Sequence, residues 1–243
     1  MKIALIGYGK MGKLIEKAAL QEKHEIVARI DSKNKISEKS LNKADVCIDF
    51  SAPSHFIENM KELAALNQTV VAGTTGWYSQ IDVIKDLVEC SKIGFFYAPN
   101  FSIGVNIFYE IVKQAASLIH SFDNYDASGF EIHHHKKKDS PSGTAIELSR
   151  LLMNELKRKK EVVYTQIDEE IKPHELHFAS VRGGQNPGQH TILFDSSEDT
   201  ITLTHQARNR EGFAKGALTA ACWLQGKKGF YTMQDMIEEK FHA

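Results

Sequence analysis

The spacing of apolar positions in the first hundred residues alternates between two periods. Short apolar runs rich in β-formers predict strands at Lys2–Ile6, Glu25–Ile30, Asp45–Phe50, Thr69–Ala72 and Ile93–Tyr97. Between them, apolar residues at every third or fourth position predict helices at Gly12–Gln21, His55–Leu66 and Gln80–Cys90. Strands and helices that alternate in this way favour an α/β fold with a doubly wound parallel sheet.

The pattern changes after Phe101. The expected elements are then a helix at Val105–Ile119, a strand at Tyr125–His133, a helix at Thr144–Lys159, and strands at Leu176–Val181, His190–Phe194 and Thr200–His205. The polar turn Asp195–Asp199 joins the last two strands and favours an antiparallel hairpin. We therefore expect a second α+β domain with a mixed or antiparallel sheet. The helix at Gly212–Leu224 is rich in small residues and is expected to pack against the first unit. The expected dinucleotide-binding domain therefore consists of residues 1–103 and 211–243, and the expected substrate-binding and oligomerisation domain of residues 104–210.

Composition excludes several classes of protein. The chain has 243 residues, of which 42% are hydrophobic and 25% charged, as in ordinary globular proteins. The formal net charge of -1 gives no global field that would attract nucleic acid. No apolar run approaches the ~18 residues of a membrane span. The three cysteines, Cys47, Cys90 and Cys222, lie among apolar residues and are expected to be buried thiols in a reducing compartment, so a cytoplasmic location is expected.

A glycine motif directly follows the first expected strand. The segment Gly7-Tyr8-Gly9-Lys10-Met11-Gly12 has the form GxGxxG and opens the first helix. Gly7 is suited to the tight turn, Gly9 to close approach of a pyrophosphate, and Gly12 to helix–strand packing. Asp31, at the end of the second strand, is the residue type that hydrogen-bonds a ribose. The pattern predicts a Rossmann-like dinucleotide site, and the alternative is a glycine-rich turn in a protein that binds no nucleotide.

Two further loops follow strands of the same sheet. Gly73-Thr74-Thr75-Gly76 and Ala98-Pro99-Asn100-Phe101 are placed to line the nicotinamide side of the site, although Gly73–Gly76 could also be a plain turn. Asp31 opposes a 2′-phosphate and favours NADH, whereas Ser32 and Lys33 are potential donors to that phosphate. NADH, NADPH or both are therefore expected as cofactor.

The segment Glu131–Ala145 holds the densest set of reactive side chains. Its end, Pro141-Ser142-Gly143-Thr144, precedes a helix and offers backbone N–H groups and hydroxyls that suit a carboxylate. An imidazole near neutral pKa suits proton delivery, and His133 with Lys137 as a neighbouring cation forms a candidate catalytic pair. Alternatively, Ser142 is only a helix N-cap, the lysines form a solvated loop, and the histidines are a chance cluster or an internal metal site. Because consecutive strand residues point to opposite faces, three adjacent histidines cannot chelate one ion, and we expect no metal.

These motifs together resemble those of the 4-hydroxy-tetrahydrodipicolinate reductase (dihydrodipicolinate reductase) family. The resemblance spans essentially the whole chain and rests above all on Glu131–Ala145, where the family pattern is E-x-H-H-x-x-K-x-D-x-P-S-G-T. Further matches are Val181–Gly184, Gly188–Thr191 and the segment from His205 to Ala217. Two departures concern the cofactor site: Lys10 stands where many members have Arg, and Ser32 rather than Arg follows Asp31.

The resemblance implies a reaction and a role for each site residue. The family reduces a cyclic dicarboxylate with NAD(P)H, with loss of water, in lysine and diaminopimelate biosynthesis. His133 would donate the proton and Lys137 would be the second catalytic residue, while His134, Ser142, Gly143 and Thr144 would hold the dicarboxylate. The residues Gly7, Tyr8, Gly9, Lys10, Met11, Gly12, Asp31, Gly73, Thr74, Thr75, Ala98, Pro99, Asn100 and Phe101 would bind the dinucleotide. A homotetramer is implied, with no nucleic-acid or membrane partner.

Other functions remain open at this point. A non-catalytic NAD(P)-sensing regulator would share the fold but would have no use for His133 and Lys137 beside a carboxylate site. A histidine-cluster protein would carry bound zinc or nickel. A thiol-dependent dehydrogenase would need an activated cysteine in a turn beside a histidine or a helix start, and none of the three cysteines has such a setting.

Overall fold

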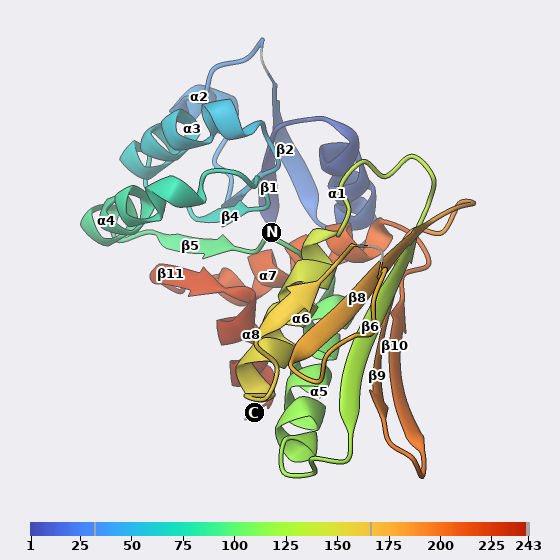
Figure 1. Cartoon of the computed structure of the whole chain (residues 1–243). Coiled ribbons are helices and arrows are strands. Elements are labelled where there is room, and N and C mark those ends of the chain that lie inside the picture. Colours follow the sequence, from blue (N-terminus) through green and yellow to red (C-terminus); the bar gives the residue numbers. More distant parts are fainter. Residues whose placement is uncertain (32, 166, 242–243) are drawn as a thin grey trace. The chain divides into compact units, whose positions relative to one another are not determined.

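A computed structural model describes residues 1–31, 33–165 and 167–241 of the chain (Figure 1). The chain divides into two compact units, Met1–Ile103 with Glu211–Ala243, and Gly104–Arg210. Each unit contains one sheet with its own hydrophobic core.

The sheet of the first unit has six parallel strands. Its strands are β1 (Lys2–Ile6), β2 (Glu25–Ile30), β3 (Val46–Asp49), β4 (Val70–Ala72), β5 (Gly94–Tyr97) and β11 (Gly229–Thr232). They lie side by side in the order β11-β5-β4-β3-β1-β2. The order reverses between β1 and β3, and open sheets of this kind bind ligands beyond the carboxyl ends of the strands at such a reversal.

Helices cover both faces of this sheet. The helical elements of the unit are α1 (Lys10–Gln21), α2 (Glu38–Leu41), α3 (Pro53–Ala65), the 3-10 turn η1 (Tyr78–Gln80), α4 (Ile81–Ser91), α7 (Glu211–Leu224) and α8 (Met233–Phe241). On one face, Ile15 of α1 and Leu218 of α7 pack with Leu5 of β1. On the other, Phe56 of α3 and Ile84 of α4 pack with Ile6. The prediction of a doubly wound parallel sheet is confirmed.

The second unit has a five-stranded mixed sheet. Its strands are β6 (Asp126–His133), β7 (Glu161–Val163), β8 (Glu175–Arg182), β9 (Gln189–Asp195) and β10 (Thr200–Gln206), and its helices are α5 (Ile103–Ile119) and α6 (Gly143–Glu155). The order is β10-β9-β6-β8-β7, with β8 parallel to β6 and β9 antiparallel to both β6 and β10. The expected hairpin is present, since Asp195 pairs with Thr200.

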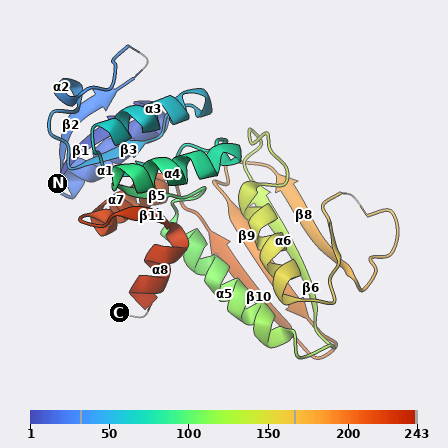
Figure 2. The ribbon, with the colours of Figure 1, turned by 90° about the vertical axis from the view of Figure 1, so that its left-hand side faces the viewer.

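The two helices of this unit lie on one face of its sheet (Figure 2). Phe108 of α5 and Leu148 of α6 pack with Phe178 of β8 and Ile192 of β9. Because side chains alternate along a strand, Glu131 and His133 of β6 point to the same face as the helices, whereas Phe130 and Ile132 point to the opposite face.

The structure corrects two expectations. Cys47 is buried, but Cys90 and Cys222 are exposed, because they lie on the solvent-facing sides of α4 and α7. The helix expected at Thr144–Lys159 ends at Glu155. None of the helices in the described part of the chain is long and apolar enough to cross a bilayer.

Candidate functional site

The loop between β1 and α1 has the backbone shape that the glycine motif requires. Gly7 has φ of +88°, a conformation that L side chains rarely adopt. A Cβ atom added to Gly12 would lie 2.6 Å from the carbonyl oxygen of Gly7, so α1 starts against the loop only because that position lacks a side chain. A Cβ atom on Gly9 would meet nothing within 4 Å, so the space in front of this residue is open.

The start of α1 fits an anion. Gly9 is the N-cap residue, and no side chain accepts a hydrogen bond from the first N–H groups of the helix. Those N–H groups and the positive end of the helix dipole suit a phosphate group. The loop therefore has the open space and the donors that the pyrophosphate of a dinucleotide needs.

The other residues of the glycine motif, Tyr8, Lys10 and Met11, differ in exposure and in hydrogen bonding. Lys10 is exposed and Met11 is partly buried. The Tyr8 hydroxyl donates to Glu16, which also accepts from Arg29, and the hydrogen bond to Glu16 is the main cause of the raised pKa of Tyr8. This network holds the Tyr8 ring beside the loop.

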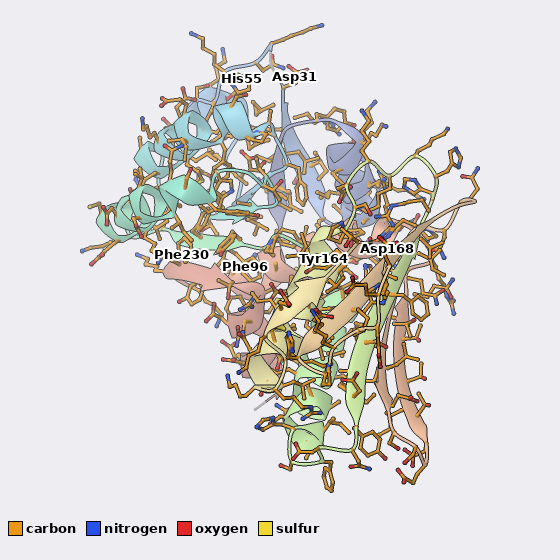
Figure 3. All side chains as sticks on the ribbon, viewed as in Figure 1. Asp31, His55, Phe96, Tyr164, Asp168 and Phe230 are labelled. Atoms are coloured by element: carbon orange, nitrogen blue, oxygen red, sulfur yellow. The ribbon has the colours of Figure 1, made fainter. Side chains whose placement is uncertain are left out.

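Asp31 directly follows β2 and is exposed (Figure 3). Its Oδ1 accepts hydrogen bonds from the backbone N–H of Lys33 at 2.8 Å and from the side chain of Asn34 at 3.2 Å. These bonds fold the loop back onto the carboxylate. Ser32, the other potential donor to a 2′-phosphate, lies outside the described residues.

The loops after β4 and β5 present backbone rather than side chains. The Thr74 hydroxyl is buried and donates to Asp49 at 2.6 Å, while the Thr74 carbonyl accepts from the Trp77 indole at 2.7 Å. Thr75 is exposed, and Gly73 lies against the Phe50 ring. Because the Thr74 hydroxyl is already bonded, this residue has little but its amide left for a ligand.

The loop after β5 is similar. Ala98 and Phe101 are 2% and 1% exposed and belong to the core, so their side chains shape the loop rather than contact a ligand. Pro99 is exposed, and Asn100 accepts the N–H of Ser102 at 2.9 Å. This loop, the one after β4 and the glycine loop follow parallel strands and therefore lie at one edge of the sheet.

In the second unit, the carboxylate of Glu131 lies at the centre of a buried polar cluster. Its Oε1 accepts hydrogen bonds from the backbone N–H of Ser142 at 3.0 Å, the Ser180 hydroxyl at 2.8 Å and the Arg182 guanidinium at 2.7 Å. Burial by itself raises the pKa of Glu131, but these donors and His190 outweigh it and hold the pKa well below its usual range. Glu131 is therefore a buried anion.

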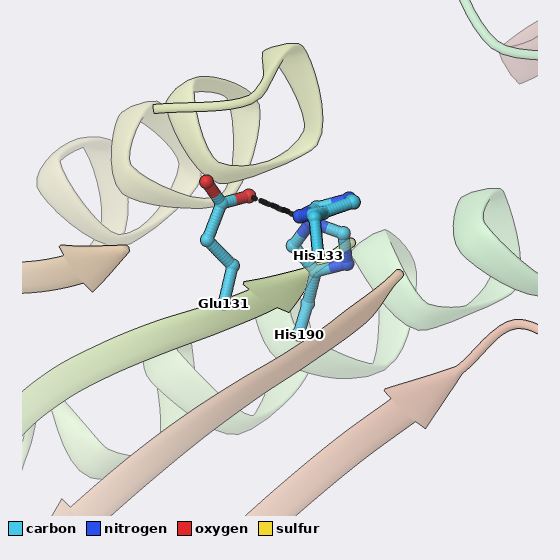
Figure 4. Close-up of side chains that lie close together, drawn as sticks. All are labelled: Glu131, His133 and His190. Carbon is cyan, nitrogen blue, oxygen red and sulfur yellow. Dashed lines mark ion pairs between the residues drawn. The ribbon is translucent and has the colours of Figure 1, made fainter. Parts of the chain in front are cut away.

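The second oxygen of Glu131 faces two imidazoles (Figure 4). Its Oε2 lies 3.3 Å from Nδ1 of His133 and 3.3 Å from Nε2 of His190, and the two rings meet edge to face with centroids 5.1 Å apart. Burial lowers the pKa of His133 to about 4; the charge of Glu131 opposes this, while His190, Lys137 and Arg182 add to it. His133 is thus a neutral imidazole at pH 7 when no anion is bound.

The segment after His133 contains the candidate residues His134 and Lys137, whose contacts are within the second unit. The Lys137 ammonium is bonded to both oxygens of Asp139, at 2.9 and 2.8 Å, and lies close enough to affect the pKa of His133. The backbone N–H of His134 donates to Asn186, and its side chain is partly exposed. His135 is held by the carbonyl of Gly184 at 3.0 Å.

Ser142 is the N-cap residue at the start of α6. Its hydroxyl accepts the N–H of Ala145 at 3.1 Å, as an N-cap residue does, and lies 3.1 Å from Nε2 of His190. The hydroxyl of Ser142 and its backbone N–H, which donates to Glu131, are therefore already bonded within the protein. A Cβ atom on the exposed Gly143 would meet nothing within 4 Å, and the Thr144 side chain hydrogen-bonds Tyr109, whose pKa burial raises to about 12.

One group in the described chain has the composition of a metal site at this position. Glu131, His133 and His190 each offer an atom, and these atoms lie within 4.8 Å of one another. However, the Arg182 guanidinium already lies 2.7 Å from the same carboxylate, and a divalent ion would be placed beside that cation. Because the guanidinium already compensates the negative charge of Glu131, these residues fit a resident metal poorly.

Sequence reasoning gave no role to several residues of this cluster. Glu131 belongs to the predicted motif but has no predicted role, and Ser180, Arg182 and His190 come from β8 and β9, far from it along the chain. The pairing of Glu131 with both Ser180 and His190 brings them together. The sequence signal that could have identified Arg182 and His190 is the match to the family pattern at Val181–Gly184 and Gly188–Thr191.

Comparison with known proteins gives a consistent result. The family models for the N-terminus and the C-terminus of dihydrodipicolinate reductase match residues 1–101 and 104–237. The chain belongs to this family. It is 37% identical to a 4-hydroxy-tetrahydrodipicolinate reductase of Christiangramia forsetii over 99% of each chain, and 37% identical to one of Archaeoglobus fulgidus over 98% of this chain and all of the other.

The fold also has a solved counterpart. A dipicolinate-bound dihydrodipicolinate reductase from Paenisporosarcina sp. TG-14 matches with a TM-score of 0.77 and 24% identity, over 97% of this chain and 98% of the other. Membership in the family makes the chain an oxidoreductase that uses NADH or NADPH.

Proposed function

We propose that this protein is a 4-hydroxy-tetrahydrodipicolinate reductase that acts in lysine and diaminopimelate biosynthesis. It would reduce the cyclic dicarboxylate to tetrahydrodipicolinate, with loss of water from the 4-hydroxy substrate. The observation that carries the proposal is the buried Glu131–His133 cluster beside the start of α6, where the space around Gly143 is open.

The dinucleotide would bind at the first unit. The N–H groups at the start of α1 would hold the pyrophosphate in front of Gly9, Asp31 would bind the adenosine ribose, and the loops after β4 and β5 would border the nicotinamide. The bound dinucleotide supplies the hydride. Because Asp31 opposes a 2′-phosphate, NADH should bind at least as well as NADPH. A preference for NADPH of 100-fold or more, roughly 2.7 kcal/mol, would mean that Lys33 or another cation dominates.

The dicarboxylate would bind at the start of α6. The N–H groups of Gly143 and Thr144 and the Thr144 hydroxyl would hold one carboxylate, with Ser142 as the cap that fixes their direction. His134 and Lys137 would add positive or donor groups around the ring. Lys137 would exchange its bond to Asp139 for one to the substrate.

His133 would deliver the proton. The carbon next to the site of hydride addition gains negative charge and must be protonated, and an imidazole at hydrogen-bond distance is suited to this step. The two carboxylates of the substrate would raise the pKa of His133 from about 4 by stabilising the imidazolium. The proton donor is therefore charged mainly when substrate is present.

The enzyme would work in the cytoplasm as a homotetramer, as the family resemblance implies. The face of the second sheet opposite α5 and α6 supports assembly, because Phe130, Ile132 and Leu193 are partly exposed there and Val181 is 48% exposed. Light scattering on the purified protein tests the tetramer.

A coupled assay tests the reaction. Aspartate semialdehyde, pyruvate and the condensing synthase generate the substrate in the cuvette, and loss of reduced-cofactor absorbance reports turnover. We expect consumption of NADH that depends on both synthase and this protein. Tight NADH binding without consumption would instead favour a non-catalytic protein that senses NAD(P).

A further inference from the structure

Glu131 has no role in the reaction as described above, although it is the most enclosed charged group of the site. It is fully buried, and its two oxygens have different partners. Oε1 accepts three hydrogen bonds from Ser142, Ser180 and Arg182, which fix the carboxylate in place. Oε2 has no aligned hydrogen-bond donor and faces Nδ1 of His133 and Nε2 of His190, both at 3.3 Å.

We propose that Glu131 is the positioning residue of the proton donor: it holds the proton of neutral His133 on Nδ1, so that Nε2 exchanges protons with the substrate. This inference rests on the proposed function, because it assigns the reactive atom of the same site. A carboxylate accepts hydrogen bonds only, so an imidazole that faces it is favoured with N–H on the facing nitrogen. The second proton of the imidazolium is then on Nε2.

The surroundings of the ring favour the same assignment. Nδ1 of His133 is enclosed, whereas the residue as a whole is 7% exposed, so a ligand can exchange protons only with the other side of the ring. On that side lies Gly188, where an added Cβ atom would approach Nε2 to 3.0 Å. The absence of a side chain at Gly188 keeps Nε2 accessible. Hydrogen bonds of catalytic groups often tighten only when substrate binds, which accounts for the imperfect alignment at Nδ1.

Glu131 also balances the charge around His133. The other groups that act on this ring are the cations Lys137, from the segment after β6, and Arg182 of β8, together with His190 of β9, and His205 of β10 lies behind His190. Among these, the negative charge of Glu131 is the one that favours the imidazolium. A neutral residue at position 131 should therefore leave the ring harder to protonate.

The first test is a long-range ¹H–¹⁵N spectrum of the ligand-free wild-type protein labelled in histidine, with His133 assigned by comparison with His133→Gln. We expect neutral His133 to be the Nδ1–H tautomer. A predominant Nε2–H tautomer would overturn the proposal. This readout needs neither activity nor a variant at position 131, so it stands even if the reaction has been assigned wrongly or Glu131 variants fail to fold.

The second test is kinetic and uses Glu131→Gln, which keeps the size and an acceptor oxygen but removes the charge. We expect kcat to fall roughly 10- to 100-fold, a part of the ~10²–10⁴ that a general acid supplies. The falling limb of the pH–kcat profile should move to lower pH, and affinity for NADH should not change. Glu131→Asp, which keeps the charge, should recover part of kcat.

The matched control is Glu175→Gln at the opposite end of β8, which removes one carboxylate from the same sheet and should retain the wild-type profile. A Glu131→Gln enzyme with wild-type kcat and an unmoved pH limb would overturn the proposal. If His133→Ala is also fully active, the fault lies in the assignment of His133 as proton donor. If only the Glu131 variant is fully active, the positioning role alone is wrong.

Discussion

The two candidate binding regions differ in whether backbone groups or side chains form most of the site. The dinucleotide region consists of backbone: Gly7 and Gly12 permit the loop, Gly9 leaves space, and the hydroxyl of Thr74 is already bonded within the protein. The substrate region depends more on side chains, with Glu131 buried among polar groups from β6, β8, β9 and the start of α6. A backbone site tolerates change at many side chains but not at its glycines, whereas a buried polar network depends on each member.

The largest expected effect is in the side-chain region. His133→Ala and Lys137→Ala should each lower kcat by ~10²–10⁴, because each removes a group that acts on the transition state. Their affinity for NADH, measured by calorimetry, should stay at the wild-type value. The double variant should lose less than the product of the single losses, since two groups that serve one transition state act as a unit.

The control for this experiment is His120→Ala, which removes the exposed histidine that directly follows α5. It should have wild-type kcat. Near-wild-type kcat in both His133→Ala and Lys137→Ala would remove the segment from the chemistry and leave the regulator as the better hypothesis.

The next largest effect is in the backbone region. Gly9→Val should weaken NADH binding about 100-fold, or ~2.7 kcal/mol, because the side chain would occupy the space of the pyrophosphate. The protein should still fold, since a Cβ atom there meets nothing within 4 Å. Gly12→Ala is the matched contrast: its Cβ atom would lie 2.6 Å from the Gly7 carbonyl oxygen, so thermal stability should fall. Unchanged NADH affinity in Gly9→Val would contradict the placement of the cofactor.

This contrast also explains how much the sequence could predict. The glycines and the alternation of strands and helices are local signals, and β1 and β2 occupy the predicted residues. The buried network was not predictable in the same way, because Ser180 and His190 meet Glu131 only through strand register. The exposure of Cys90 and Cys222 shows the same limit: apolar neighbours along a helix do not fix which side of it faces solvent.

The pH dependence should show a smaller effect. His133 must be protonated to act as an acid, so activity falls as pH rises above its pKa. In the free enzyme, burial holds that pKa at about 4, whereas the charge of the bound dicarboxylate should raise it. The falling limb of kcat, which reports the complex, should therefore lie at higher pH than that of kcat/KM, which reports the free enzyme. Coincident limbs would mean that His133 is not the group that titrates.

The smallest effect is expected at the start of α6. Thr144→Val removes one hydroxyl donor to a carboxylate and should raise the substrate KM about 10-fold, or ~1.4 kcal/mol, while kcat stays near the wild-type value. The same hydroxyl bonds Tyr109, so Thr144→Val also removes a hydrogen-bond partner of that partly buried phenol. Thr144→Ser keeps the hydroxyl and loses only a methyl group, and its KM should stay near wild type. If Thr144→Ser and Thr144→Val raise KM equally, the hydroxyl does not hold the carboxylate, and the backbone N–H groups of the helix start account for binding, as we propose for the helix start at Gly9 in the other unit.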